Sequence, residues 1–155
     1  MSTTDTFPIR RIDHVRFYVG NARQSAYFYR QVFGFDVVAF HGLETGLKHE
    51  VDWLLEQNQA RFLFSAPVRP GHAIANQLAV HGDHVQDIAF EVDDVDWSFK
   101  IAVARGAEAA RDPFTLEDDF GQVRLASIKT YGDTIHTFIN RDKFHGHFLP
   151  KFEPR

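Results

Sequence analysis

The alternation of apolar and polar residues at the start of the chain predicts a strand that leads directly into a helix. Over residues 12–19, His14 and Arg16 fall on one face of the expected strand, and Val15 falls on the other. Apolar residues then recur at helical spacing over residues 22–33, and Gly34 is a typical helix stop.

The same pattern returns later in the chain. His14 aligns with Asp87 (87 − 14 = 73), and phenylalanine and valine follow both residues at matching distances. The glycines that end the two expected helices, Gly34 and Gly106, differ by 72 positions. The chain therefore contains one internal repeat with two copies.

Turn residues and apolar runs predict that each copy is a strand, a helix and three further strands. In the first copy we expect a helix at 22–33 and strands at 12–19, 35–40, 51–56 and 60–65. In the second copy we expect a strand from Asp87, a helix at 95–105 and strands at 107–111, 122–130 and 134–140. The modules would span residues 12–66 and 84–141, with a linker at 67–83 that carries a short helix at 73–81. A tail at 142–155 ends on a linker-like Phe-Glu-Pro-Arg sequence.

These elements predict an α+β fold made of two βαβββ modules. Neither module can bury its apolar sheet face alone. The two sheets are therefore expected to form one eight-stranded incomplete barrel with the helices outside. The concave interior of such a barrel suits a small ligand.

Composition narrows the possible functions. The chain has 155 residues, which fits a single domain, and a formal net charge of −4 without a basic run. Nucleic acid and anionic membrane are therefore poor partners. There is no cysteine, so disulfides and thiolate chemistry are excluded. No apolar run has the length of a membrane span, and a cytoplasmic location is expected.

Three residues could form a metal site. His14 and Asp87 open the first strands of the two copies, and His136 lies in the last strand, with Ile135 and Thr137 expected to point the other way. Two imidazoles and a carboxylate on rigid strands are the ligand set of a facial iron(II) triad. The fourth symmetric position is Phe62 (136 − 74), which is not a ligand. The alternative is that all three residues are structural, and the spacing leaves both readings open.

Other polar residues have simpler interpretations. Asp93, Asp94 and Asp96 precede a helix, whose N-terminus attracts carboxylates. The acidic run at 117–119 is expected to be a solvated loop. Seven further histidines lie in expected loops or beside the linker helix: His41, His49, His72, His81, His84, His145 and His147. No phosphate-binding loop or serine nucleophile motif is present.

The paired modules resemble the vicinal-oxygen-chelate superfamily, which includes glyoxalase I and the extradiol dioxygenases. The stretches FYVGNA, AFEVDDVD and TYGDTIHTF, with FHGHFLPKFEP in the tail, are similar to the N-terminal half of the 4-hydroxyphenylpyruvate dioxygenase family. Hydroxymandelate synthase shares that half and is the near alternative. The resemblance covers residues 12–154.

The resemblance implies different roles for the two halves of the family enzyme. The complete enzyme of that family converts 4-hydroxyphenylpyruvate and O2 to homogentisate and CO2 with Fe(II), in tyrosine catabolism. Its two histidine ligands and one glutamate ligand belong to a second half, which would begin after this chain stops. His14, Asp87 and His136 match those positions in a degenerate copy that is expected to bind no iron. The expected partner is the catalytic half or a second copy of this chain, as in a dimer.

Two functions therefore remain open from the sequence. The chain could be the N-terminal domain of such a dioxygenase, silent by itself. Alternatively, it could be a stand-alone metal-dependent enzyme or small-ligand-binding protein that uses His14, Asp87 and His136.

Overall fold

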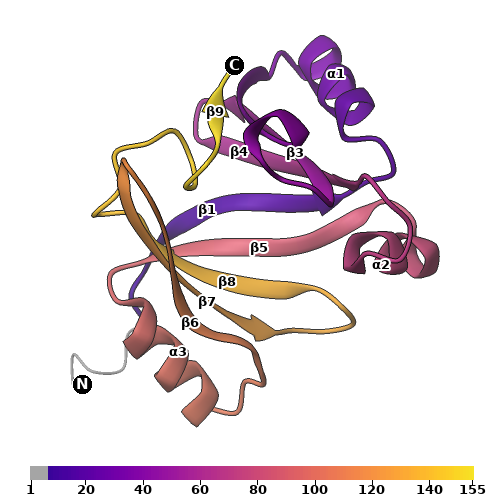
Figure 1. Cartoon of the computed structure of the whole chain (residues 1–155). Helices are drawn as coiled ribbons and strands as arrows, with labels where there is room; N and C mark the ends of the chain where they lie inside the picture. Colours follow the sequence, from indigo (N-terminus) through magenta and orange to yellow (C-terminus); the bar gives the residue numbers. More distant parts are fainter. Residues whose placement is uncertain (1–6) are drawn as a thin grey trace.

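The two copies of the repeat form the two halves of one bent, mixed sheet (Figure 1). The computed structural model describes residues 7–155. The first half contains β1 (Ile9–Tyr18), α1 (Ala22–Phe33), β2 (Asp36–His41), η2 (Leu43–Thr45), β3 (Glu50–Gln57) and β4 (Ala60–Pro67). The second half contains β5 (His84–Val92), α3 (Val95–Ala104), β6 (Ala109–Asp118), β7 (Gly121–Lys129) and β8 (Ile135–Asn140). The helix α2 (Ala73–His81) joins the halves, and β9 (Glu153–Pro154) follows the second.

Strand order confirms the incomplete barrel. The order is β6-β7-β8-β5-β1-β4-β3-β2-β9, and the two end strands do not pair with each other. The opening strands β1 and β5 lie antiparallel at the centre of the sheet. Each is parallel to the last strand of its own module, β4 or β8. The sheet therefore curls around a concave face without closing.

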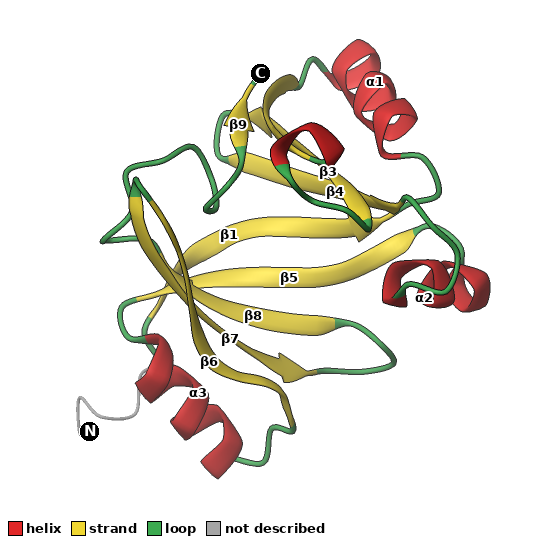
Figure 2. Ribbon diagram, in the orientation of Figure 1, coloured by secondary structure: helices red, strands yellow, loops and turns green. Residues whose placement is uncertain are grey.

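The helices α1 and α3 cover the outer, convex face of the two halves (Figure 2). Each packs small residues, Ala26 from α1 and Ala102 from α3, against its own half of the sheet. The core beneath α1 is built from the buried residues Val19, Ala22, Ala26, Phe35, Leu55, Phe64 and Ala66. The core beneath α3 contains Val92, Val95, Ala102, Ala126 and Phe138. The protein thus has two matched hydrophobic cores outside the cup.

Equivalent residues begin the two helices. The side chain of Asn21 accepts a hydrogen bond from the backbone N–H of Gln24, and Asp94 accepts one from Trp97, each at 3.0 Å. The caps lie 73 positions apart (94 − 21), as do the donors (97 − 24). The expectation that the acidic cluster marks a helix start is confirmed at Asp94. Gly34 ends α1 with φ of +76°, as predicted from the sequence.

Two expected boundaries, in β1 and β6, were wrong by three residues or more. β1 begins at Ile9, three residues before the expected start. β6 continues to Asp118, well beyond the expected end at residue 111, and its pairing with β7 is interrupted by two irregularities that obscure alternation. Glu117 therefore belongs to this strand rather than to a solvated loop. Asp118 accepts hydrogen bonds from the backbone N–H groups of Phe120 and Lys151.

The tail is part of the fold rather than a linker. Residues 153–154 form β9, which pairs with Ala39 and Phe40 of β2, so the sheet has nine strands rather than eight. Before β9, the buried Phe148 packs with residues of β2, β3 and β4. Gly121 allows the tail to approach β7, because a Cβ there would lie 2.1 Å from the carbonyl oxygen of Lys143. The tail therefore crosses the open side of the cup.

No helix within residues 7–155 is long and apolar enough to cross a membrane.

Candidate functional site

Two equivalent bulges shape the centre of the concave face. In β1, Ile12 faces Phe90 and His14 faces Ala89, so Asp13 is an extra residue in the strand. The same irregularity occurs in β5 at position 86 (13 + 73), between the pairs that Asp87 and Val85 make with β1. Strict alternation would place Asp13 on the face opposite His14, and the bulge breaks that alternation. Both side chains are buried, and His14 Nδ1 lies 2.6 Å from Asp13 Oδ2.

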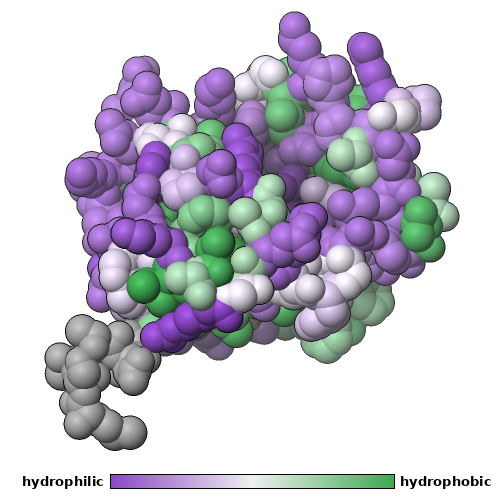
Figure 3. Space-filling view, turned by 90° about the horizontal axis from the view of Figure 1, so that it is seen from below, coloured by the Kyte–Doolittle hydropathy of each residue, from purple (hydrophilic) through white to green (hydrophobic). Residues whose placement is uncertain are grey.

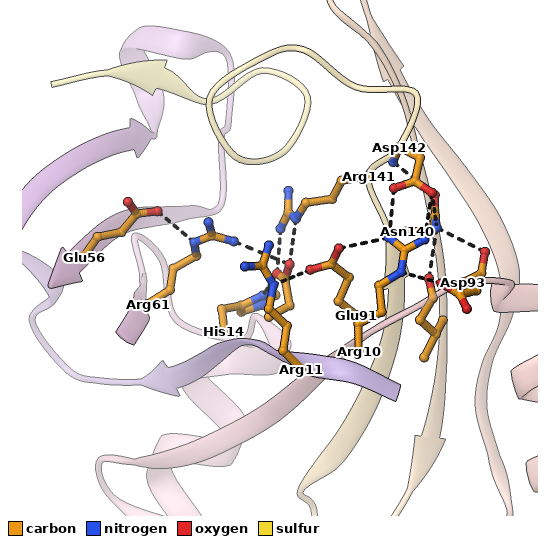
Figure 4. A network of polar contacts seen from close by, with 12 residues as sticks. Arg10, Arg11, His14, Glu56, Arg61, Glu91, Asp93, Asn140, Arg141 and Asp142 are labelled. Atoms are coloured by element: carbon orange, nitrogen blue, oxygen red, sulfur yellow. Dashed lines mark hydrogen bonds and ion pairs between the residues drawn. The ribbon is translucent and has the colours of Figure 1, made fainter. Parts of the chain in front are cut away.

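Asp13 connects β1 to Arg61 of β4 and to Arg141, which directly follows β8. Both arginines are labelled in Figure 4. Arg141 donates to both carboxylate oxygens, at 2.8 and 2.7 Å, and Arg61 adds a longer contact at 3.4 Å. Burial alone would raise the pKa of the Asp13 carboxyl, but hydrogen bonds from Arg141 and His14 hold it well below its usual range. Asp13 is thus a fixed, buried negative charge beside His14.

A second ionic group lies along the same edge of β1 (Figure 4). Arg11 donates to Glu91 at 2.5 Å, and Arg10 pairs with Glu91, Asp93 and Asp142. Its hydrogen bond to Asp142 lowers the pKa of that carboxyl to about 2. These pairs join β1, β5 and the start of the tail.

The inside of the cup contains a cavity of about 290 Å³. Its polar lining includes His14, Arg16, Gln86, Asp87 and Thr137. A second cavity of about 510 Å³ lies beside it and is also lined by Arg16. The residues common to both cavities are Arg16, Leu63, Arg111, Leu116 and Leu149. The concave face therefore offers a hollow whose polar centre lies on β1 and β5, as expected for a ligand-sized interior.

Arg16 places a positive charge on the β1 side of this hollow. Its Nε donates to Ser65 Oγ at 2.8 Å, and its Nη2 donates to Glu50 at 3.2 Å and lies 3.6 Å from Asp52. Ser65 in turn donates to Asp52 at 2.5 Å. Burial raises the pKa of Asp52 to about 6, although the charge of Arg16 opposes the rise. Asp52 can therefore exchange a proton near neutral pH.

Asp87 is held by β8. Its two carboxylate oxygens accept hydrogen bonds from the backbone N–H of Thr137 at 3.0 Å and from the Thr137 hydroxyl at 2.5 Å. Ser127 completes the group, 2.9 Å from the same hydroxyl. Burial raises the pKa of the Asp87 carboxyl, and the charge of His14 opposes this rise.

The structure brings together only two of the three predicted metal ligands. His14 and Asp87 line the same cavity, but His136 lies on the outer face, where its ring packs on Phe90 with centroids 4.8 Å apart. Its Nδ1 is hydrogen-bonded to the carbonyl oxygen of Ile88 at 2.9 Å. The assignment of His136 to the concave face was therefore wrong.

His136 points outward because successive residues of β8 alternate between the two faces of the sheet. Thr137 and Ile135 line the cavity, so the residue between them points outward. The symmetric position on β4 is Leu63 (137 − 74), which also lines the cavity, whereas Phe62 packs against the core beneath α1. Sequence alternation alone could not decide which face was concave.

The inward residues do not fit a three-ligand iron centre. Within residues 7–155, no group of three or more histidine, cysteine, aspartate or glutamate side chains could hold a metal ion. His14 uses Nδ1 on Asp13, Asp87 uses both oxygens on Thr137, and the guanidinium of Arg16 adds positive charge beside them. The arrangement suits internal hydrogen bonding and recognition of a small polar molecule.

Sequence reasoning missed Arg16, Gln86, Thr137 and Arg111 as residues of the hollow. A signal was available for Arg16, because a charged residue between apolar neighbours in a central strand needs partners when buried. Of the remaining histidines, His41 lines the second cavity, and the others within residues 7–155 line neither cavity. His81, for example, pairs with Asp133 at 2.5 Å beside α2, and His49 stacks on His72.

Comparison with known proteins identifies relatives of the whole chain. It is 42% identical to the 4-hydroxyphenylpyruvate dioxygenase of Neurospora crassa over 158 residues, which cover 90% of this chain and 38% of that protein. It is 45% identical to the enzyme of the same name from Yarrowia lipolytica, over 92% of this chain and 37% of the relative. The chain thus spans less than two fifths of these relatives, and it matches their N-terminal part.

Solved structures show the same fold. A mutant of 4-hydroxymandelate synthase from Streptomyces coelicolor superposes with a TM-score of 0.83 and 26% identity, covering 96% of this chain and 42% of that chain. A methylmalonyl-CoA epimerase from the same organism gives a TM-score of 0.68 at 22% identity, which is a likeness of fold alone. Residues 11–144 match the family described as the glyoxalase/bleomycin resistance protein/dioxygenase superfamily. With its two βαβββ halves around a common cup, this chain belongs to that superfamily.

Proposed function

We propose that this chain is the N-terminal, non-catalytic domain of a 4-hydroxyphenylpyruvate dioxygenase-like protein. The observation that carries the proposal is the pattern of similarity. More than 40% identity extends over about nine tenths of the chain but reaches less than two fifths of the relatives' length. A domain of a larger enzyme is expected to give this pattern.

The geometry of the cup supports a structural role. A three-ligand metal centre needs three donors aimed at one point, and here one of the predicted donors lies on the other side of the sheet. The two that remain inside are engaged with Asp13 and Thr137. Arg16 provides a permanent internal cation that balances nearby carboxylates.

The whole protein would convert 4-hydroxyphenylpyruvate and O2 to homogentisate and CO2, in the cytoplasmic breakdown of tyrosine. Fe(II) would be held by the other part of that protein and would supply the oxygen chemistry. This chain would contribute packing and assembly. Its partner would be the catalytic part that the longer relatives contain.

The outer face of α1 supports the existence of such a partner. It exposes four large apolar side chains, namely Tyr27, Phe28, Val32 and Phe33, each more than half exposed. On α3, the exposed large apolar residue is Val103. Elsewhere, in the view from below, hydrophobic residues are interspersed among hydrophilic ones (Figure 3). We propose that the catalytic part of the longer polypeptide covers the α1 face.

Metal binding by the purified chain tests the proposal. After incubation with Fe(II), Co(II) or Zn(II) and desalting, elemental analysis should find far less than one ion per chain. The same samples should form no homogentisate from 4-hydroxyphenylpyruvate and O2, as followed by liquid chromatography.

Variants make the result decisive. If one ion per chain is retained and His14→Ala or Asp87→Asn abolishes its binding, the cup is a metal site and the non-catalytic assignment fails. His136→Ala is the matched control, because this histidine lies on the outer face. Homogentisate formation by the chain alone would also overturn the assignment.

A further inference from the structure

Gln86 has a buried acceptor that the fold does not use. It is the extra residue of the β5 bulge, it lines the 290 Å³ cavity, and only 7% of its surface is exposed. Its Oε1 has no hydrogen-bond partner within residues 7–155. Buried polar atoms without a partner are rare in folded proteins and are a feature of sites that receive a donor from elsewhere.

A second acceptor lies next to it. The carboxylate of Asp87 lines the same cavity and keeps lone pairs beyond the two hydrogen bonds from Thr137, because a carboxylate has about four acceptor positions. Arg16 faces Asp87 across the β1–β5 pair, but its guanidinium is paired with Glu50 and Asp52, which balance its charge. This corner of the cavity therefore favours a group with several N–H donors, such as an ammonium.

Arg111 provides the opposite charge. It extends from the edge strand β6, lines both cavities, and forms no ion pair among the described residues. Its guanidinium lies over the ring of Phe114, 3.4 Å from the ring centroid. Stacking of this kind leaves the planar N–H donors at the edge of the group available for a carboxylate.

The remaining walls of the cavity are apolar. They are formed chiefly by Leu63, Phe114, Leu116, Leu125 and Leu149. The volume is at the small end of the range for ligand pockets, so the occupant must be small. An ammonium site, a carboxylate site and an apolar wall in one small cavity match one class of molecule.

We propose that the cup binds a small α-amino acid with an apolar side chain. The ammonium donates to Gln86 Oε1 and Asp87, the carboxylate pairs with Arg111, and the side chain packs on the leucine wall. This site requires no metal and no reaction. It is therefore independent of whether the chain is part of a dioxygenase.

Calorimetric titration of the purified chain with L-leucine and L-phenylalanine tests the proposal. We expect saturable binding with one site per chain. The oxo-acid analogue of leucine lacks the ammonium, and isoamylamine lacks the carboxylate. Each should bind about tenfold more weakly or worse, because one charged contact is missing. Equal binding of either analogue, or no binding of both amino acids, would overturn the proposal.

Two substitutions locate the site. Gln86→Leu should weaken leucine binding about tenfold while keeping or raising the melting temperature, since it removes an unpaired buried acceptor. Arg111→Leu should weaken binding similarly. The matched controls, Gln122→Leu and Arg69→Leu, change residues outside this cavity and should leave affinity unchanged. Unaltered affinity in both Gln86→Leu and Arg111→Leu, with the melting temperature maintained, would exclude this cavity as the site.

Discussion

The two βαβββ modules share a backbone plan but fill it with different chemistry. Both helices begin with a side-chain cap at the same repeat position, Asn21 and Asp94, and both opening strands carry a bulge, at Asp13 and Gln86. The buried polar groups differ. Asp13 has two arginine partners and a histidine, whereas Gln86 has an acceptor with no partner among the described residues.

The same contrast occurs on the strands that flank the centre. Asp52 faces Ser65 across β3 and β4, while Ser127 faces Thr137 across β7 and β8. Both pairs are joined by side-chain hydrogen bonds, but only the first contains a carboxylate. The backbone features are thus equivalent in the two modules, whereas the partners of the buried polar groups differ. The comparison shows that the repeat determines where polar groups are buried. The residues around each buried group determine whether it is paired or left with a free acceptor.

The largest expected effect concerns the two bulges. Asp13→Asn should lower the free energy of unfolding by about 3–5 kcal/mol, because Arg141 and Arg61 lose a buried counter-charge. Gln86→Leu at the matching position should change it by less than about 1 kcal/mol, or raise it. Urea unfolding at neutral pH measures both. Similar losses in the two variants would show that the bulges need a polar residue for geometry rather than for charge.

The pH dependence of stability should distinguish the two cross-strand pairs. Asp52 has a pKa of about 6 in the folded chain and about 3.9 when unfolded. The folded state therefore binds more protons between pH 4 and 6, and this group lowers stability by about 3 kcal/mol as the pH rises through that window.

Asp52→Asn should remove that decrease. The free energy of unfolding of the variant, measured relative to that of the native chain, should therefore rise by about 3 kcal/mol between pH 4 and 6. Ser127→Ala removes no titrating group, so the stability of this variant should follow the pH profile of the native chain. Parallel profiles for the native chain and Asp52→Asn would show that Asp52 does not titrate in this window.

The smallest effect is expected at the helix caps, where the modules are alike. Asn21→Ala and Asp94→Ala should each cost about 1 kcal/mol of unfolding free energy, because each removes one hydrogen bond to the first turn. Thermal unfolding monitored by circular dichroism would detect both. A clear difference between the two losses would mean that tertiary contacts, rather than the cap hydrogen bond, determine the stability of one helix.

Much of this architecture could be predicted from local patterns. The 73-residue repeat, the two capped helices and the turn at Gly34 depend on neighbouring residues, so they are visible in the sequence. The repeat also placed His14 and Asp87 correctly at the centre of the cup. Weak alternation in β6 hid its full length, since its pairing is interrupted by irregularities.

The facing of side chains and the role of the tail were decided only by the tertiary structure. Successive residues of a strand point to opposite faces of the sheet, so His136 lies on the outer side and Thr137 faces the cup. The bulge at Asp13 overrides alternation because its carboxylate must meet Arg141, which is 128 positions away along the chain. The burial of Phe148 likewise depends on strands far away in sequence. The sequence by itself determined the repeat and its elements, whereas long-range packing determined which residues share the cavity.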